Sequence, residues 1–160
     1  MSSTVQLTNV REFMIRHLTD VFDTMLSLKA GLAPDNDLPH CDERVSGSVG
    51  FAGETVYGAV YLHLSAPFAV QITSAMLGLP VEEITGETEV NDVVGEVTNM
   101  LTGGLKSWLC DAGALCAVST PAIIRGRSFS VEPMPDVERE LLVFACGAER
   151  VVVEIHIKID

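Results

Sequence analysis

The sequence predicts an α+β (mixed α/β) protein with a largely antiparallel β-sheet covered by long helices. Three observations lead to this fold class. Apolar residues recur at helical spacing in three segments, and two pairs of strand-like segments are each joined by a tight turn. The resulting order is helix, hairpin, helix, helix and then several strands.

The first element is an amphipathic helix over residues 8–28. Its apolar face and one histidine recur at three- and four-residue spacing: Val10, Phe13, Met14, His17, Leu18, Val21, Phe22 and Met25. Gly31 and Pro34 are expected to end it. A loop rich in Pro, Asp and Asn follows, through about Glu43.

A β-hairpin is expected over residues 45–64, which read VSGSVGFAGETVYGAVYLHL, with its tight turn near Gly53–Glu54. The second strand alternates between two faces, and the many glycines predict close approach of another backbone or a packed element. His63 lies on this strand between apolar neighbours, and we interpret it as structural rather than catalytic.

The second helix is expected over residues 66–78, ended by Gly78 and Pro80. A third, long helix covers roughly residues 87–111. The segments CAVSTPAIIRG and SFSVE and a Pro-rich turn at 133–135 come next. Two strong strands, ELLVFACG and RVVVEIHIKI, then form a second hairpin. We interpret the last strand as an edge, where sheet pairing between two copies would produce a dimer.

Composition predicts a single domain over residues 1–160, because 48% hydrophobic residues in 160 suffice for a sizeable core. No apolar run approaches the length of a bilayer span, and the first residues, MSSTVQLTNVREF, lack the apolar centre of a signal peptide. From this we expect a soluble, cytoplasmic protein.

The chain is strongly acidic, with 10 Lys and Arg against 22 Asp and Glu and a formal net charge of -12. This balance argues against nucleic acid and anionic membranes as partners, because both need positive charge. The four cysteines form no CxxC pair and share no zinc-like spacing with the four histidines. We interpret Cys41, Cys110, Cys116 and Cys146 as buried or neutral free thiols.

The third helix has two different faces. Its apolar stripe must be buried and consists of Val90, Val93, Val94, Val97, Met100, Leu101, Leu105, Trp108 and Leu109. A polar row with spacings of four, three, four and three residues faces outward and contains Asp92, Glu96, Asn99, Gly103 and Lys106. Gly103 and Gly104 each weaken a helix by about 1 kcal/mol relative to Ala, so another reason for their presence is expected.

Several interpretations of this row are open from spacing alone. It could be an ordinary solvated face, with its glycines serving packing. A divalent-metal site is poorly supported, because Asp92 and Glu96 are too few ligands for a dedicated cage. Acid–base catalysis would need a pocket and a substrate signal. Nucleophilic catalysis and nucleotide binding lack their motifs, since the chain has no GxSxG, P-loop or GxGxxG.

The ordered set of residues, DVVGEVTNMLTGGLKSWL followed by STPAIIRG, resembles the CheC/CheX/FliY family of bacterial chemotaxis phosphatases. The signature of that family is an acid or serine, a glutamate four residues on, an asparagine three further and a later proline. These positions are Asp92, Glu96, Asn99 and Pro121 here. The glycine-rich hairpin and the helix that ends in Met-Leu-Gly are also similar, so the resemblance covers roughly residues 8–126. A single row is typical of the CheX branch.

The resemblance implies a CheC-like fold and dephosphorylation of a phospho-aspartyl, CheY-like response regulator. It implies that Glu96 pairs with the regulator's active-site lysine and that Asn99 orients the attacking water. Asp92, Gly103 and Lys106 would take part in partner binding, and Pro121 would shape the strand that follows it. No cofactor is expected on this chain, because Mg²⁺ would come with the regulator.

The same resemblance implies a homodimer paired through sheet edges. The alternative function is a non-catalytic CheX-like module that binds a response regulator or a flagellar-motor component, because a fold does not determine a function. A small-molecule-binding domain would need an apolar pocket with polar anchors, to which no stretch of the sequence points.

Overall fold

A computed structural model describes residues 5–36 and 42–160 of the chain. The predicted loop before the first hairpin and Cys41 therefore lie partly or wholly outside the described residues. The elements in chain order are α1 (Leu7–Leu26), β1 (Gly31–Leu32), β2 (Arg44–Gly53), β3 (Val56–Ser65), α2 (Ala66–Leu77), the 3₁₀ turn η1 (Val81–Glu83), α3 (Glu87–Asp111), β4 (Cys116–Val118), β5 (Ala122–Gly126), β6 (Glu138–Cys146) and β7 (Glu149–Ile159).

These bounds agree closely with the predicted helices and hairpins. The helix α1 ends earlier than predicted, at Leu26, because Ser27 adopts a left-handed backbone conformation with φ 54°. Gly31, which was expected to end that helix, instead lies in the short strand β1 and pairs with Ala145. The SFSVE segment forms no strand, and residues 127–137 are a long loop between β5 and β6.

The sheet is antiparallel throughout, with the order β1-β6-β7-β3-β2-β4 and with β5 also paired to β2. The prediction that the last strand forms an edge is wrong. β7 lies between β6 and β3, since Leu142 pairs with Val153 and Leu62 pairs with the same residue from the other side. Burial agrees, because every residue from Val151 to Ile157 is buried, as expected of a central strand covered on both faces.

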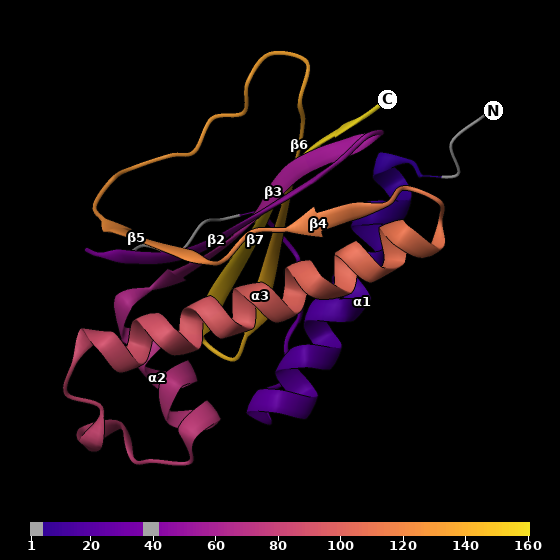
Figure 1. Ribbon diagram of the computed structural model, residues 1–160. Coiled ribbons are helices and arrows are strands. Elements are labelled where there is room, and N and C mark those ends of the chain that lie inside the picture. Colours follow the sequence, from indigo (N-terminus) through magenta and orange to yellow (C-terminus); the bar gives the residue numbers. More distant parts are fainter. Residues whose placement is uncertain (1–4, 37–41) are drawn as a thin grey trace.

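The three α-helices cover one face of the sheet, and the loop 127–137 arches away from them on the opposite side (Figure 1). One hydrophobic cluster joins the helices to the sheet, and its largest fully buried members include Met14, Phe22, Leu62, Leu105 and Ile155. The predicted α+β fold with a helix-covered antiparallel sheet is thus confirmed. No helix among the described residues combines the length and apolar character needed to cross a membrane.

Two glycines allow helix α3 to pack closely against its neighbours. A Cβ on Gly47 of β2 would overlap the side chain of Thr98, and a Cβ on Gly104 of α3 itself would overlap the imidazole of His17. The His17 Nε2 atom lies 3.0 Å from the carbonyl oxygen of Met100, which ties α1 to α3. The contact of Gly47 with Thr98 confirms the close approach that the glycine-rich hairpin predicted. Together with the contacts of His17 it holds α3 against the sheet and α1.

Candidate functional site

The apolar stripe of α3 is buried as predicted and anchors the helix. Seven of its members have at most 5% of their surface exposed: Val90, Val93, Val94, Val97, Leu101, Leu105 and Leu109. Trp108 is half-buried and stacks on Phe13 of α1, with 5.5 Å between the ring centroids. Thr98 and Thr102 are also buried, and their hydroxyls donate to the carbonyl oxygens of Val94 and Thr98. The inner face of α3 is therefore closely packed, and its two buried hydroxyl groups are hydrogen-bonded.

The predicted row lies on the other side of α3. Asp92 and Glu96 are exposed, whereas Asn99, Gly103 and Lys106 are partly exposed. Within residues 5–36 and 42–160, the side chains of Glu96 and Asn99 make no hydrogen bond or ion pair. At 1.5 Å per residue the row runs for about 21 Å along the helix. Two polar groups one turn apart are thus held on a rigid helix and are available to another molecule.

The two glycines of α3 have different roles. A Cβ on Gly103 would meet no atom within 4 Å, so the space beside Asn99 is open. Gly104 lies about 100° further around the helix and makes room for His17. The expectation that these glycines have a reason beyond helix formation is met by Gly104 in packing, whereas Gly103 leaves clearance on the outward face.

Pro121 borders the row from the side. Its Cβ and Cγ atoms lie 3.5 Å from the position that a Cβ on Gly95 would occupy, and Gly95 immediately precedes Glu96. Pro121 also directly precedes β5. The sequence analysis did not predict the contact between Pro121 and Gly95. A glycine immediately before Glu96 was the one sign in the sequence that another element packs closely there.

Arg125 of β5 was also missed by the sequence analysis. Its Nη2 and Nε atoms donate to Asn91 Oδ1 at 2.8 and 3.1 Å, and its guanidinium lies 3.4 Å from Glu43 and 3.6 Å from Glu87. These contacts fasten the N-terminal turns of α3 to the sheet. No local pattern could have identified them, because Arg125 and Asn91 are 34 residues apart.

The cysteines and acids of the described residues form no metal centre, since no group of three His, Cys, Asp or Glu side chains in this part of the chain could hold an ion. Cys110, Cys116 and Cys146 are free thiols, as predicted. Burial raises the pKa of the Cys116 and Cys146 thiols, so both stay protonated at neutral pH.

The fold is the CheC-like fold of solved chemotaxis proteins. CheX from Vibrio vulnificus is similar to this chain, with 29% identity and a TM-score of 0.76 over 93% of this chain and 96% of that one. A CheC-like superfamily protein from Shewanella has 28% identity and a TM-score of 0.76, over 96% and 99% of the two chains.

The family follows from a second comparison. The family model for "Chemotaxis phosphatase CheX" matches residues 45–145, and this chain belongs to that family. A third solved relative is the CheX of the CheX-CheY-BeF3-Mg complex from Borrelia burgdorferi. It has 21% identity and a TM-score of 0.77 over 93% of this chain and 97% of that one, and so supports the fold. No curated protein matches the sequence.

Proposed function

We propose that this protein dephosphorylates a phospho-aspartyl response regulator of the CheY type by inserting Glu96 and Asn99 into the regulator's active site. The observation that carries the proposal is the outward position of these two side chains, one turn apart on α3. Glu96 is exposed and Asn99 is partly exposed, and neither has a partner in the described part of its own chain. Membership of a chemotaxis phosphatase family supports the reaction, and the solved Borrelia burgdorferi complex of CheX with CheY supports the class of partner.

The chemistry requires little from the phosphatase. A water oxygen attacks the phosphorus of the aspartyl phosphate, the bond from phosphorus to the aspartyl oxygen breaks, and inorganic phosphate and a free carboxylate result. Phosphoryl transfer of this kind depends on positioning and on electrostatic stabilisation. The Asn99 carboxamide can orient the water through hydrogen bonds without ionising. Mg²⁺ would be supplied with the regulator.

Glu96 has a docking role in this proposal. An exposed carboxylate at this position would pair with the regulator's active-site lysine, and the open space at Gly103 would let the partner approach beside Asn99. Asp92 would extend the contact toward the N-terminal end of the helix, and Lys106 would meet acidic surface at the other end. The open, outward orientation of the row supports these assignments.

Phosphate release from a phosphorylated regulator tests the proposal. Asn99→Ala should lower the stimulated rate about 100-fold, the scale of loss when a reacting group is misplaced. Glu96→Ala or Glu96→Lys should weaken both binding and turnover. The matched control is Gln71→Ala, which removes an exposed carboxamide from α2 and should leave the rate unchanged. Full activity in Asn99→Ala would overturn the mechanism.

The same assay separates the enzyme from a non-catalytic module. A phosphatase shortens the lifetime of the phosphorylated regulator when present in substoichiometric amounts. A binding module would change that lifetime only in proportion to the complex formed, or would leave it unchanged. Accelerated dephosphorylation at substoichiometric amounts of this protein would therefore identify an enzyme. No variant is needed to distinguish the two functions.

We also propose a homodimer paired through a sheet edge. With β7 in the centre of the sheet, this arrangement needs another edge, and we propose the part of β6 that β1 leaves uncovered rather than β4 or β5 at the other side of the sheet. Strand β1 covers only Phe144 and Ala145 of β6, and Ala33 N donates to Val143 O, so residues 138–142 have no strand outside them among the described residues. Light scattering on the purified chain should give the mass of two copies, and a monomer at all concentrations would contradict this arrangement.

A further inference from the structure

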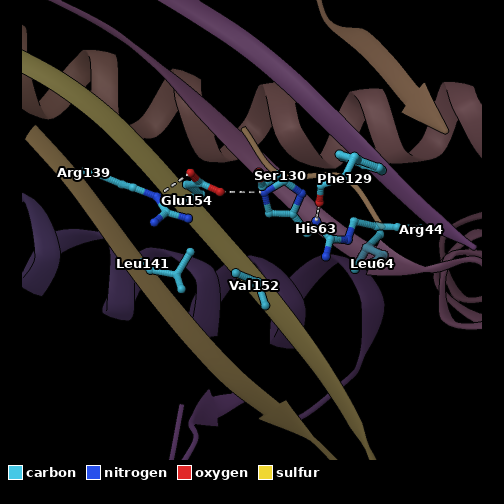
Figure 2. A pocket seen from close by; sticks show the side chains of 9 residues that line it. All are labelled: Arg44, His63, Leu64, Phe129, Ser130, Arg139, Leu141, Val152 and Glu154. Carbon is cyan, nitrogen blue, oxygen red and sulfur yellow. Dashed lines mark hydrogen bonds and ion pairs between the residues drawn. The ribbon is translucent and has the colours of Figure 1, made fainter. Parts of the chain in front are cut away.

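A second polar site lies on the face of the sheet opposite the helices. It is a pocket of about 110 Å³ between the strands and the loop 127–137. Figure 2 shows Arg139 and Arg44 at its two ends, with Glu154 and His63 between them and with Leu141 and Val152 along one side. None of these residues belongs to the row on α3, so the proposed phosphatase function does not account for this site.

The charged group in the middle of the pocket is already compensated. Glu154, which is 2% exposed, accepts from His63 Nε2 at 3.0 Å through one oxygen. Its other oxygen accepts from Arg139 Nε and from His156 Nε2, each at 2.7 Å. Burial by itself would raise the pKa of Glu154, but these hydrogen bonds outweigh it and lower the pKa to about 2. The carboxylate is therefore ionised and its oxygens are occupied.

The arginines retain donors. A guanidinium carries five N–H groups. Among the described contacts, Arg139 uses its Nε on Glu154, and Arg44 uses Nη1 on the carbonyl oxygen of Phe129 at 3.1 Å. The residues that line the pocket include two guanidinium groups and one carboxylate, and so carry a net positive charge in a chain whose formal charge is -12. The hydrogen bond to Glu154 raises the pKa of the Arg139 guanidinium, and Glu132, which is not among the lining residues, lies close enough to raise it further. Such a concentration of positive charge favours an anion.

The walls limit the size and character of that anion. Phe129 lies against the Arg44 guanidinium at 4.8 Å from its ring centroid, and together with Leu141 and Val152 it gives the pocket an apolar side. A cavity of about 110 Å³ has room for a small group of non-hydrogen atoms. This space accommodates a carboxylate with a short alkyl chain.

A purely structural explanation is weaker. A buried ion-pair network costs desolvation energy and is often no more stabilising than well-packed apolar residues of the same volume. An apolar sheet face under the loop would therefore have sufficed for folding. We propose that this pocket is a binding site for a small organic carboxylate, held by Arg44 and Arg139 and with its alkyl part against Phe129, Leu141 and Val152.

Amide chemical shifts of the full chain, recorded during titration with sodium propionate at constant ionic strength and pH 7, test the proposal. Saturable shifts should centre on His63, Phe129 and Val152, with a dissociation constant of about 1 mM, the scale expected for so small a ligand. Propionamide has the same size without the charge and should give no saturable shifts. Sodium chloride at the same ionic strength should likewise give none.

Two arginine variants and a control complete the experiment. Arg44→Gln should weaken propionate binding about tenfold or more, because a charge-assisted hydrogen bond is lost. Arg139→Gln should do the same, but it also removes a partner of Glu154, so Arg44→Gln is the decisive variant. Arg127→Gln changes an exposed arginine of the same loop and should bind like the unaltered chain.

Saturable shifts that respond to Arg44→Gln but not to Arg127→Gln support the site. Absence of saturation, equal shifts with propionamide or chloride, or binding unchanged in a folded Arg44→Gln variant would each overturn it. The readout needs no regulator and no phosphate release. Its failure would therefore leave the proposed phosphatase function untouched, and failure of that function would leave this result standing.

Discussion

A methyl group added to Gly47 would overlap the side chain of Thr98, the residue that immediately precedes Asn99 on α3. The strand β2 and the helix that carries the proposed catalytic pair are therefore in direct contact at this point. The depth at which α3 sits on the sheet depends on the missing side chain at Gly47. This relationship connects a glycine of the first hairpin to the position of Asn99.

We expect Gly47→Ala to lower the free energy of unfolding by about 1 to 3 kcal/mol, because overpacking of a closely packed contact has a cost of this size. Thr98→Ala in the same chain should restore part of the loss by removing the hydroxyl and methyl groups. Urea unfolding measures both. Gly31→Ala is the control, since a Cβ there meets no atom within 4 Å. Equal stability of Gly47→Ala and Gly31→Ala would contradict the contact.

Substitution of Gly103 should separate stability from function. Gly103→Ala should raise the free energy of unfolding by up to about 1 kcal/mol, because alanine favours the helix and its Cβ meets open space. A larger side chain, as in Gly103→Leu, should keep the fold but reduce phosphate release by obstructing the approach beside Asn99. Unfolding curves and the phosphate-release assay on the same samples give both quantities.

The adjacent glycine provides the contrast for that experiment. Gly104→Ala should destabilise the chain, since its Cβ would overlap the His17 imidazole that holds α1 against α3. If Gly103→Leu left phosphate release unchanged, the outward clearance would have no role in docking. If Gly104→Ala proved as stable as Gly103→Ala, the packing of α1 on α3 would be looser than the structure shows.

Arg125 should control the order of the first turns of α3. Arg125→Ala removes both hydrogen bonds to Asn91 and should cost about 1 to 2 kcal/mol, because hydrogen bonds to charged groups contribute on this scale. Amide hydrogen exchange should accelerate around Asn91 more than around Leu109. Arg127→Ala, which alters an exposed neighbour, should leave the exchange pattern unchanged. A uniform acceleration along α3 would argue against a local anchor.

Glu154 should make stability depend on acid pH. Its pKa is lower in the folded state, about 2, than the ordinary value of 4.5, so the unfolded chain takes up the proton first. The resulting stabilisation is present above pH 4.5 and is lost as the pH falls toward 2. A shift of this size corresponds to about 3 kcal/mol for a buried group.

The comparison of Glu154→Gln with the unaltered chain tests this dependence. The difference in the free energy of unfolding should be largest at pH 7 and should shrink as the pH falls below 4.5. Glu12→Gln, which alters an exposed acid of α1, should differ little from the unaltered chain at either pH. A Glu154→Gln difference that did not change with pH would show that packing, rather than ionisation, is what the substitution disturbs.

Much of the fold and of the candidate site follows from local spacing. The approximate range predicted for α3, residues 87–111, agrees with the observed helix, and its buried stripe and outward row were separated correctly, because a period of 3.6 residues determines which side chains share a face. Turn residues likewise located both hairpins. Glu96 and Asn99 could therefore be placed together from the sequence, although their roles stay proposals.

The arrangement of the sheet could not be obtained in this way. The alternation in β7 is that of a strand with an apolar face, and it does not reveal that the strand lies between β6 and β3 rather than at an edge. The packing of Pro121 on Gly95 and the bonds from Arg125 to Asn91 depend on how β5 lies beside α3. The order of the strands and the packing of β5 beside α3 depend on contacts between residues far apart in the sequence. Local periodicity carries no information about such contacts.

The sequence by itself thus determined the elements, the two faces of α3 and the residues of its outward row, because each is a property of neighbouring positions along the chain. Only the tertiary structure decided how close that helix lies to the sheet, which strand is central and where the second polar pocket forms. His63 and Glu154 are 91 residues apart, and they meet in a buried hydrogen bond because β3 and β7 pair. The burial that keeps this bond from water exists only once the sheet is assembled.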